Sequence, residues 1–191
     1  MKVLVTGATG FVGRALCDAL VQSKHQVVAI SRSPWEMQPT SSSLSNSEQS
    51  TQVLCRVTAD FGNTLGIQAP LEACHAVVHC AARVHQVRET STDPLADYRL
   101  VNTHATLNLA KVAAQAGVRR FVFLSSVKVN GDFSPAGQPF KAEQAAPADP
   151  YGLSKWEAEM GLREIAAKTG MELVIIRPPL VYGPGVQANF L

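Results

Sequence analysis

The sequence predicts an α/β fold, a doubly wound parallel sheet with helices on both faces. Six short runs rich in valine, isoleucine, leucine and phenylalanine alternate with stretches whose apolar residues recur at helical spacing. A glycine-rich turn joins the first apolar run to the first helical stretch. With 191 residues, the chain can bury one sizeable core. We therefore expect one domain that binds its ligands beyond the carboxyl ends of the strands.

The first strand is expected at residues 2–5 and leads into a turn whose glycines are spaced Gly-x-x-Gly-x-x-Gly. Glycine can take positive φ and lets backbone approach a ligand, and the free N–H groups at a helix N-terminus attract anions. The turn therefore predicts a site for a dinucleotide pyrophosphate. The alternative is a turn that only packs the helix onto the strand. The cofactor contacts predicted here are Gly7, Thr9, Gly10, Phe11, Val12 and Gly13.

The later elements follow from the same apolar runs and from helix boundary residues. Strands are expected at residues 27–30, 53–58, 76–80, 121–124 and 173–176. Helical stretches are expected at residues 65–74, 94–116 and 150–168. Asp149 as N-cap, Pro150 in the first turn and Gly170 after the last turn delimit the final helix. Polar, proline- and glycine-rich stretches predict surface loops at residues 31–51 and 130–148.

The composition argues against several classes of protein. The formal charge is +2 with no basic stripe, so nucleic-acid binding has no electrostatic support. There is no apolar run of membrane-spanning length and no secretory leader pattern, so we expect a cytoplasmic protein without membrane contact. The cysteines form no C-x-x-C pair and are expected to be reduced, and the histidines show no ligand spacing that would predict a metal site. The cysteines are Cys17, Cys55, Cys74 and Cys80.

Polar residues follow the second and third strands, where the adenosine part of a dinucleotide would lie. Ser31 and Arg32 follow the second strand, and no carboxylate stands there to repel a 2′-phosphate, which favours NADP over NAD. A solvated arginine at a strand end is the alternative. Asp60 and Phe61 follow the third strand at the expected adenine edge. A turn or helix cap is the alternative for Asp60.

Tyr151 and Lys155 lie four residues apart on the last helix and share one face. An ammonium beside a phenol should lower the pKa of the tyrosine, which could then exchange a proton with a sugar or alcohol hydroxyl. Ser125 and Ser126 end the fifth strand, where a hydroxyl could bind the same substrate oxygen. The alternatives are an ordinary surface pair and serines that cap backbone groups.

Together these motifs resemble the extended short-chain dehydrogenase/reductase family, and within it the NAD-dependent epimerase/dehydratase branch, whose cofactor domain is a Rossmann sheet. The turn 6–13 is similar to the family's cofactor loop, and the segment 124–131 to its catalytic-serine segment. The resemblance implies that Ser126, Tyr151 and Lys155 are catalytic. The cofactor contacts that it implies are Ala81, Ala82, Asn102, Ser125, Tyr151, Lys155 and Pro178, and the expected substrate contacts are His85, Lys128 and Asn189.

The resemblance implies an NAD(P)-dependent oxidoreductase or epimerase that transfers hydride at C4 of a nucleotide sugar. Val127 and Lys128 stand where sugar 4,6-dehydratases carry Asp-Glu, which disfavours dehydration. Asn130 stands where 4-epimerases usually carry tyrosine. The segments 125–131 and 177–185 are similar to those of UDP-4-keto-6-deoxy-hexosamine reductases of bacterial polysaccharide synthesis. A reductase and a 4-epimerase therefore both remain open, and a non-catalytic dinucleotide-binding regulator is the second class.

We expect residues 1–177 to form the dinucleotide-binding domain and residues 178–191 to begin a smaller substrate lobe. Members of the resembled family continue well beyond this point, so most of that lobe is expected to be missing from a truncated chain. The resemblance also implies a homodimer through the helices at about 94–116 and 150–168.

Overall fold

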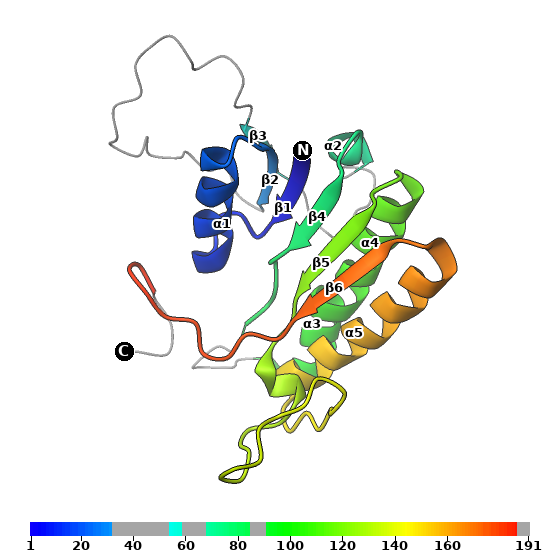
Figure 1. Cartoon of the computed structure of the whole chain (residues 1–191). Coiled ribbons are helices and arrows are strands. Elements are labelled where there is room, and N and C mark those ends of the chain that lie inside the picture. The colour runs from blue at the N-terminus through cyan, green and yellow to red at the C-terminus, as the bar shows by residue number, and fades with distance from the viewer. Residues whose placement is uncertain (32–53, 59–67, 85–90, 187–191) are drawn as a thin grey trace.

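A computed structural model describes residues 1–31, 54–58, 68–84 and 91–186. Within these residues, six parallel strands form one sheet in the order β3-β2-β1-β4-β5-β6 (Figure 1). The strands are β1 (Lys2–Thr6), β2 (Gln26–Ser31), β3 (Leu54–Thr58), β4 (Ala76–His79), β5 (Arg120–Leu124) and β6 (Glu172–Ile176). The order reverses between β1 and β4, which is where doubly wound sheets bind ligands. The predicted fold class is confirmed, with each strand boundary within one residue.

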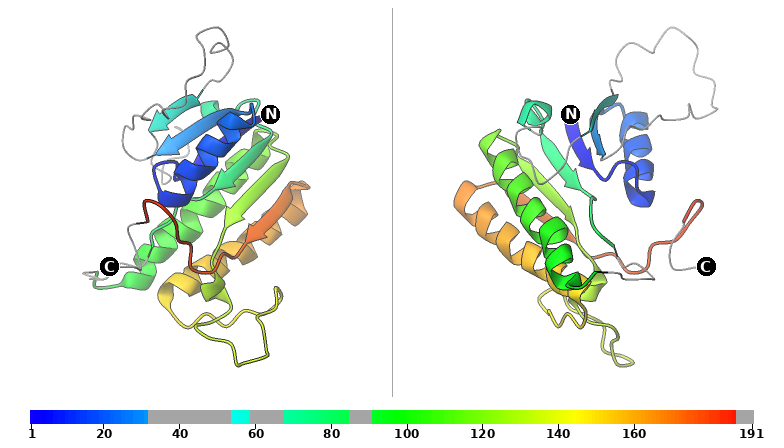
Figure 2. Two further views of the ribbon diagram at one scale, coloured as in Figure 1. Left: turned by 60° about the vertical axis from the view of Figure 1, so that its left-hand side comes forward. Right: turned by 180° about the vertical axis from the view of Figure 1, so that it is seen from behind.

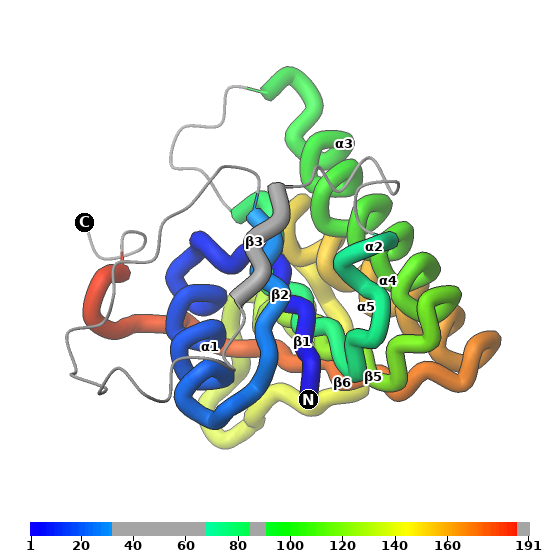
Figure 3. The backbone as a smooth tube through the Cα atoms, turned by 90° about the horizontal axis from the view of Figure 1, so that it is seen from above, coloured from blue at the N-terminus to red at the C-terminus, as the bar shows by residue number. Residues whose placement is uncertain are grey.

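Helices cover the two faces of the sheet unequally. In Figures 1 and 2, α1 (Phe11–Gln22) lies on one face, while α3 (Pro94–Tyr98), α4 (Ala105–Gln115) and α5 (Pro150–Thr169) lie on the other. The view along the strands in Figure 3 shows the same division, with α2 (Gln68–Leu71) on the side of α4. Successive strand residues point to opposite faces, so each face has its own core. Leu4, Val77 and Phe121 pack with α4 and α5, whereas Val3 and Val5 pack with α1.

The helix expected over residues 94–116 is interrupted. Between α3 and α4 the chain forms a π-helical turn, Arg99–His104. A π-turn holds more residues per turn than an α-helix, and this one carries the fully buried Asn102 into contact with neighbouring segments. The helical connection expected at 65–74 is described only from residue 68, where α2 occupies four residues.

The boundaries of α5 are as predicted. Asp149 is the N-cap, and its carboxylate accepts a hydrogen bond from the backbone N–H of Gly152 at 2.7 Å. Pro150 opens the helix, and Gly170 ends it with φ at +73°. Local capping chemistry therefore positions the helix that carries Tyr151 and Lys155.

After β6 the chain crosses the carboxyl edge of the sheet towards α1 (Figure 1). The carbonyl of Pro178 accepts a hydrogen bond from the backbone N–H of Val127, and Gly183 approaches the ring of Phe11. The division into domains at residue 177 remains a prediction. Cys17, Cys74 and Cys80 are free thiols, and the side chain of Cys55 lies outside the described residues. Across the described helices, none has both the length and the apolar character needed to cross a membrane.

Candidate active site

The glycine turn is packed tightly against the end of β4. Gly7 has φ at +66°, and a Cβ there would lie 2.7 Å from the backbone nitrogen of Ala81. A Cβ on Gly13 would lie 2.1 Å from the carbonyl oxygen of Gly7. The Gly10 N–H donates to that same oxygen at 2.9 Å, and Gly10 is the N-cap of α1. The glycines therefore do pack the turn against neighbouring main chain. The first N–H groups of α1 lie at the switch point, where the predicted pyrophosphate would lie.

A row of buried, hydrogen-bonded side chains fixes the segment after β4, which lies beside this turn. His79 bonds Thr6 Oγ1 through Nδ1 at 2.7 Å and Thr106 Oγ1 through Nε2 at 2.8 Å. The Ala81 N–H also donates to Thr6 Oγ1, so we assign the Thr6 hydroxyl as donor to Nδ1 and Nε2–H as donor to Thr106. Burial lowers the pKa of His79 to about 3, so its imidazole is neutral. These hydrogen bonds hold Ala81 against Gly7, and the sequence analysis did not anticipate them.

Lys155 connects α5 with the end of β5. Its side chain is 1% exposed, Nζ donates to the carbonyl of Leu124 at 2.9 Å, and Nζ lies 4.6 Å from the centre of the Phe123 ring. Burial lowers the pKa of Lys155 to about 8, while Cys80 and Glu159 act in the opposite direction. Because Leu124 ends β5 and parallel strands share one carboxyl edge, the bond to its carbonyl places the ammonium at the same edge of the sheet as the glycine turn.

Ser126 and Tyr151, two predicted catalytic residues, are brought together. Ser126 interacts with the Tyr151 side chain and lowers the pKa of its phenol. Ser126 also caps the 3₁₀ turn Val127–Val129 and accepts from the Lys128 N–H at 3.2 Å. A Cβ on Gly152 would lie 2.7 Å from the carbonyl oxygen of Lys128, so the absent side chain lets the first turn of α5 approach the serine turn.

The pKa of Tyr151 departs from the sequence-based expectation. Burial raises it above its ordinary value, the hydrogen bond with Ser126 opposes that rise, and Asp149 and Tyr98 add to it. Tyr98 packs edge-on against Tyr151 with 5.9 Å between ring centres. The expected fall caused by Lys155 is wrong for this structure, because burial of the phenol is the largest cause of the shift and raises the pKa.

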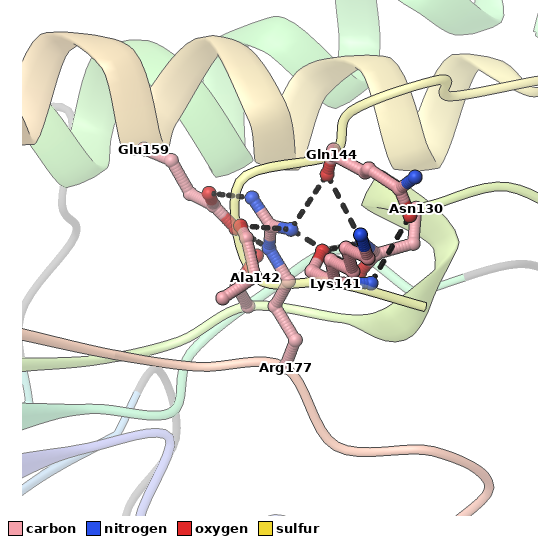
Figure 4. A network of polar contacts seen from close by, with 7 residues as sticks. Asn130, Lys141, Ala142, Gln144, Glu159 and Arg177 are labelled. Atoms are coloured by element: carbon pink, nitrogen blue, oxygen red, sulfur yellow. Dashed lines mark hydrogen bonds and ion pairs between the residues drawn. The ribbon is translucent and has the colours of Figure 1, made fainter. Parts of the chain in front are cut away.

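The Ser125 hydroxyl is bonded to Glu159. It donates to the buried carboxylate at 2.6 Å, and Arg177 binds the same carboxylate through Nε at 2.8 Å and Nη2 at 2.6 Å. Figure 4 shows the other side of Arg177, where Nη1 donates to the carbonyls of Ala142 and Gln144. The cofactor contact of Ser125, which the family resemblance implies, stays a prediction. Its hydroxyl, which could bind the substrate oxygen, instead donates to Glu159 of α5.

The side chain of Asn102 is hydrogen-bonded to the backbone of Arg83 and to the side chain of Ser154. Its Oδ1 accepts from the Arg83 N–H at 2.8 Å, and its Nδ2 donates to the Arg83 carbonyl and to Ser154 Oγ, each at 3.0 Å. The amide therefore fixes the segment after β4 to α5. A cofactor contact of Asn102 likewise stays a prediction.

The other predicted residues surround this edge of the sheet. Ser31 is buried at the end of β2, and the next residue along the turn from Gly7, Ala8, donates to Ile30 at 3.3 Å. Lys128 forms ion pairs with Asp132 and Asp149, which raise its pKa. Thr9, Phe11, Val12 and Ala82 are incompletely buried. Five predicted residues lie outside the described part of the chain: Arg32, Asp60, Phe61, His85 and Asn189.

Sequence reasoning also missed the contacts of Glu159 and Arg177. The signal for Glu159 is its place four residues after Lys155, on the same helical face. The described residues contain no group of three or more histidine, cysteine, aspartate or glutamate side chains arranged to hold a metal ion.

Comparisons with known proteins agree with this geometry. The family model of the NAD dependent epimerase/dehydratase family matches residues 3–191. A UDP-glucose 4-epimerase of Vibrio cholerae is 43% identical over 190 residues, which are 99% of this chain and 54% of that protein. A cinnamoyl-CoA reductase 1 of Oryza sativa subsp. japonica is 32% identical over 194 residues, covering 97% and 54%.

Among solved structures, MoeE5 in complex with UDP-glucuronic acid and NAD superposes with a TM-score of 0.81 at 33% identity. The match covers 100% of this chain and 58% of that one. The chain thus spans about half the length of the curated relatives it matches.

Proposed function

Because this chain belongs to the NAD-dependent epimerase/dehydratase family, we propose that it forms the cofactor-binding part of an enzyme acting on a nucleotide sugar. The membership confirms the family resemblance of the sequence motifs. The observation that carries the proposal is the convergence of three residues at the end of β5: Ser126 interacts with Tyr151, and the buried Lys155, one helical turn further along α5, bonds the Leu124 carbonyl.

The residues at the switch point fit a dinucleotide. Gly7 and Gly13 leave no room for a Cβ, and the first turn of α1 directs its N–H groups beyond β1. We assign the pyrophosphate to this turn and the nicotinamide ribose to Tyr151 and Lys155. The bound nicotinamide would supply the hydride chemistry at C4 of the sugar.

Tyr151 is assigned the proton transfer at the C4 oxygen of the substrate. Ser126, which interacts with its phenol, would hold the substrate oxygen beside it. The raised pKa of Tyr151 keeps the phenol protonated, the form that returns a proton to the C4 oxygen in the reductive half of the reaction. In the oxidative half the phenolate would take the proton of the C4 hydroxyl, and the ammonium of Lys155, at the same edge of the sheet, would favour that form.

We propose that the reaction is 4-epimerisation, since the relative with 43% identity is named a UDP-glucose 4-epimerase. A reductase that consumes its cofactor is the second candidate. It is favoured by Asn130, which occupies the position where 4-epimerases usually carry tyrosine. Its amide donates to the carbonyls of Lys141 and Gln144 and holds the loop.

NAD is the proposed cofactor. The family description names NAD, and MoeE5 was solved with NAD. The preference for NADP drawn from Ser31 and Arg32 has no support from these comparisons. Titration with NADH and NADPH, followed by nicotinamide fluorescence, separates the two, and we expect NADH to bind at least tenfold more tightly.

The test of the reaction compares Tyr151→Phe with Tyr182→Phe, a matched change at a tyrosine that is 77% exposed. Interconversion of UDP-glucose and UDP-galactose is followed by NMR, and NADH consumption by absorbance. We expect Tyr151→Phe to lose about 10²–10⁴-fold in turnover and Tyr182→Phe to keep it within about twofold. Stoichiometric NADH consumption without epimerised sugar would favour the reductase, and full turnover by Tyr151→Phe would overturn the role of Tyr151.

The homodimer through α3–α4 and α5 is also retained as a proposal. It is supported by Leu100 and Met160, which are 61% and 46% exposed. Light scattering on Leu100→Glu should show a monomer where the unchanged chain shows a dimer, and a monomeric unchanged chain would contradict the proposal.

A further inference from the structure

Glu159 is a fully buried carboxylate that is bonded to two other segments of the chain. It is 1% exposed and accepts three hydrogen bonds, one from Ser125 Oγ and two from the guanidinium of Arg177 (Figure 4). The Arg177 side chain is 14% exposed. Removing two charges from water is costly, and an apolar pair often packs equally well. Stability alone is therefore a weak explanation for this pair.

Each partner of Glu159 belongs to a different segment of the candidate site. Ser125 precedes Ser126 at the end of β5. Arg177 directly follows β6 and precedes Pro178, whose carbonyl accepts from the N–H of Val127 in the serine turn. The third guanidinium nitrogen of Arg177 donates to Asn130 Oδ1 and to carbonyls of the loop after it. One carboxylate thus joins the serine turn, the loop and the segment after β6 to α5.

Glu159 also lies one helical turn after Lys155 on the same buried face of α5. The titratable groups that interact with the buried ammonium are Cys80 and His79 from the β4 end and Glu159 from its own helix. Among these three, Glu159 is the carboxylate, and Arg177 partly neutralises it.

We propose that Glu159 is a positioning residue of the site, which fixes the strand end carrying Ser126, anchors the segment beginning at Arg177 and supplies the negative charge near Lys155. This inference rests on the proposed function, because it assigns Glu159 a role at the same site. Glu159 acts through these residues and is not itself assigned a contact with substrate or cofactor.

The two halves of the ion pair should affect Lys155 in opposite directions. Glu159→Gln removes the carboxylate, so the pKa of Lys155 should fall below its value of about 8. Arg177→Gln leaves the carboxylate without its counter-charge, so the pKa of Lys155 should rise. A general loosening of the fold would shift both variants in one direction. Opposite shifts therefore report on charge.

The experiment labels the chain with [¹³Cε]lysine, assigns the Lys155 signal with Lys155→Met, and follows its pH titration by NMR. We expect a downward shift of about 1 pH unit in Glu159→Gln and an upward shift in Arg177→Gln. Glu157→Gln is the matched control, since Glu157 lies on the same helix in an ion pair with Arg99 at the surface. Its Lys155 titration should match that of the unchanged chain.

NADH titration supplies the second readout. Glu159→Gln should weaken NADH binding about tenfold, and Glu157→Gln should leave it within twofold. Ser125→Ala keeps the ion pair and loses one hydrogen bond, so it should weaken binding about threefold with an unchanged Lys155 titration.

An unchanged Lys155 titration in Glu159→Gln, or shifts of the same sign in the two charge variants, would overturn the inference. If Glu159→Gln does not fold, the rise in Arg177→Gln decides the charge role. If neither charge variant folds, the NADH affinity of Ser125→Ala decides the positioning role, and unchanged affinity overturns it. Failure of the unchanged chain to bind NADH would contradict the proposed function, and the Lys155 titration would still decide the role of Glu159.

Discussion

The glycine turn after β1 and the Ser126–Tyr151–Lys155 cluster after β5 lie at the same edge of the sheet, but different interactions hold them. Backbone contact fixes the turn: the space for a Cβ on Gly7 or Gly13 is filled by neighbouring main-chain atoms. Long-range polar contacts fix the cluster, including the bond of Lys155 to the Leu124 carbonyl. Main-chain contact excludes any side chain at the two glycines, whereas single hydrogen bonds of the cluster can be removed one at a time by substitution.

The largest expected effect of a single change is at the turn. Gly13→Ala places a methyl group 2.1 Å from the Gly7 carbonyl oxygen, so we expect the free energy of unfolding to fall by about 3 kcal/mol. Urea denaturation measures it. The control is Gly117→Ala, where no atom lies within 4 Å of the added Cβ and positive φ alone should cost about 1 kcal/mol. Equal losses in the two variants would show that main-chain contact does not fix the turn.

The next largest effect is at Asn102, on the side of the cluster. Asn102→Ala removes three hydrogen bonds and leaves the partly buried backbone of Arg83 without two of them, so the free energy of unfolding should fall by about 2–3 kcal/mol. His104→Ala, at an exposed position in the same π-helical turn, is the control and should change it by under about 0.5 kcal/mol. A loss no larger than that of the control would show that Asn102 does not hold this side.

Substitution of Lys155 should raise the free energy of unfolding at pH 7, whereas the two changes above lower it. Its pKa of about 8 in the folded chain lies below its ordinary value of 10.5, so between these values the unfolded chain binds more protons and stability rises with pH. Lys155→Met should remove this rise and stabilise the chain at pH 7 by about 2 kcal/mol, after allowance for its lost contacts. Thermal unfolding at pH 7 and pH 10 measures both effects, with Lys111→Met on the exposed face of α4 as control. Destabilisation at pH 7 would show that the buried charge is compensated.

The same contrast explains how much was predictable from sequence. Strands, the turn and the ends of α5 follow from local rules: apolar runs, glycine spacing, the Asp149 cap and Gly170. The partners of Glu159 come from residues 34 positions before it and 18 after it, and no periodicity marks such pairs. Similarly, burial of the Tyr151 phenol is the largest cause of its raised pKa, so the helical spacing to Lys155 alone gave the wrong sign for that pKa. The π-helical turn has no residue pattern from which it could be predicted.

The central claim is that these two differently stabilised regions form one dinucleotide site. Hydrogen–deuterium exchange of the chain with and without NADH tests it most directly, with the far end of α5 at residues 163–169 as internal reference. We expect NADH to slow exchange both at residues 7–13 and at residues 124–131 and 151–155, while the reference stays unchanged. Protection of one region without the other, or of neither, would contradict the claim.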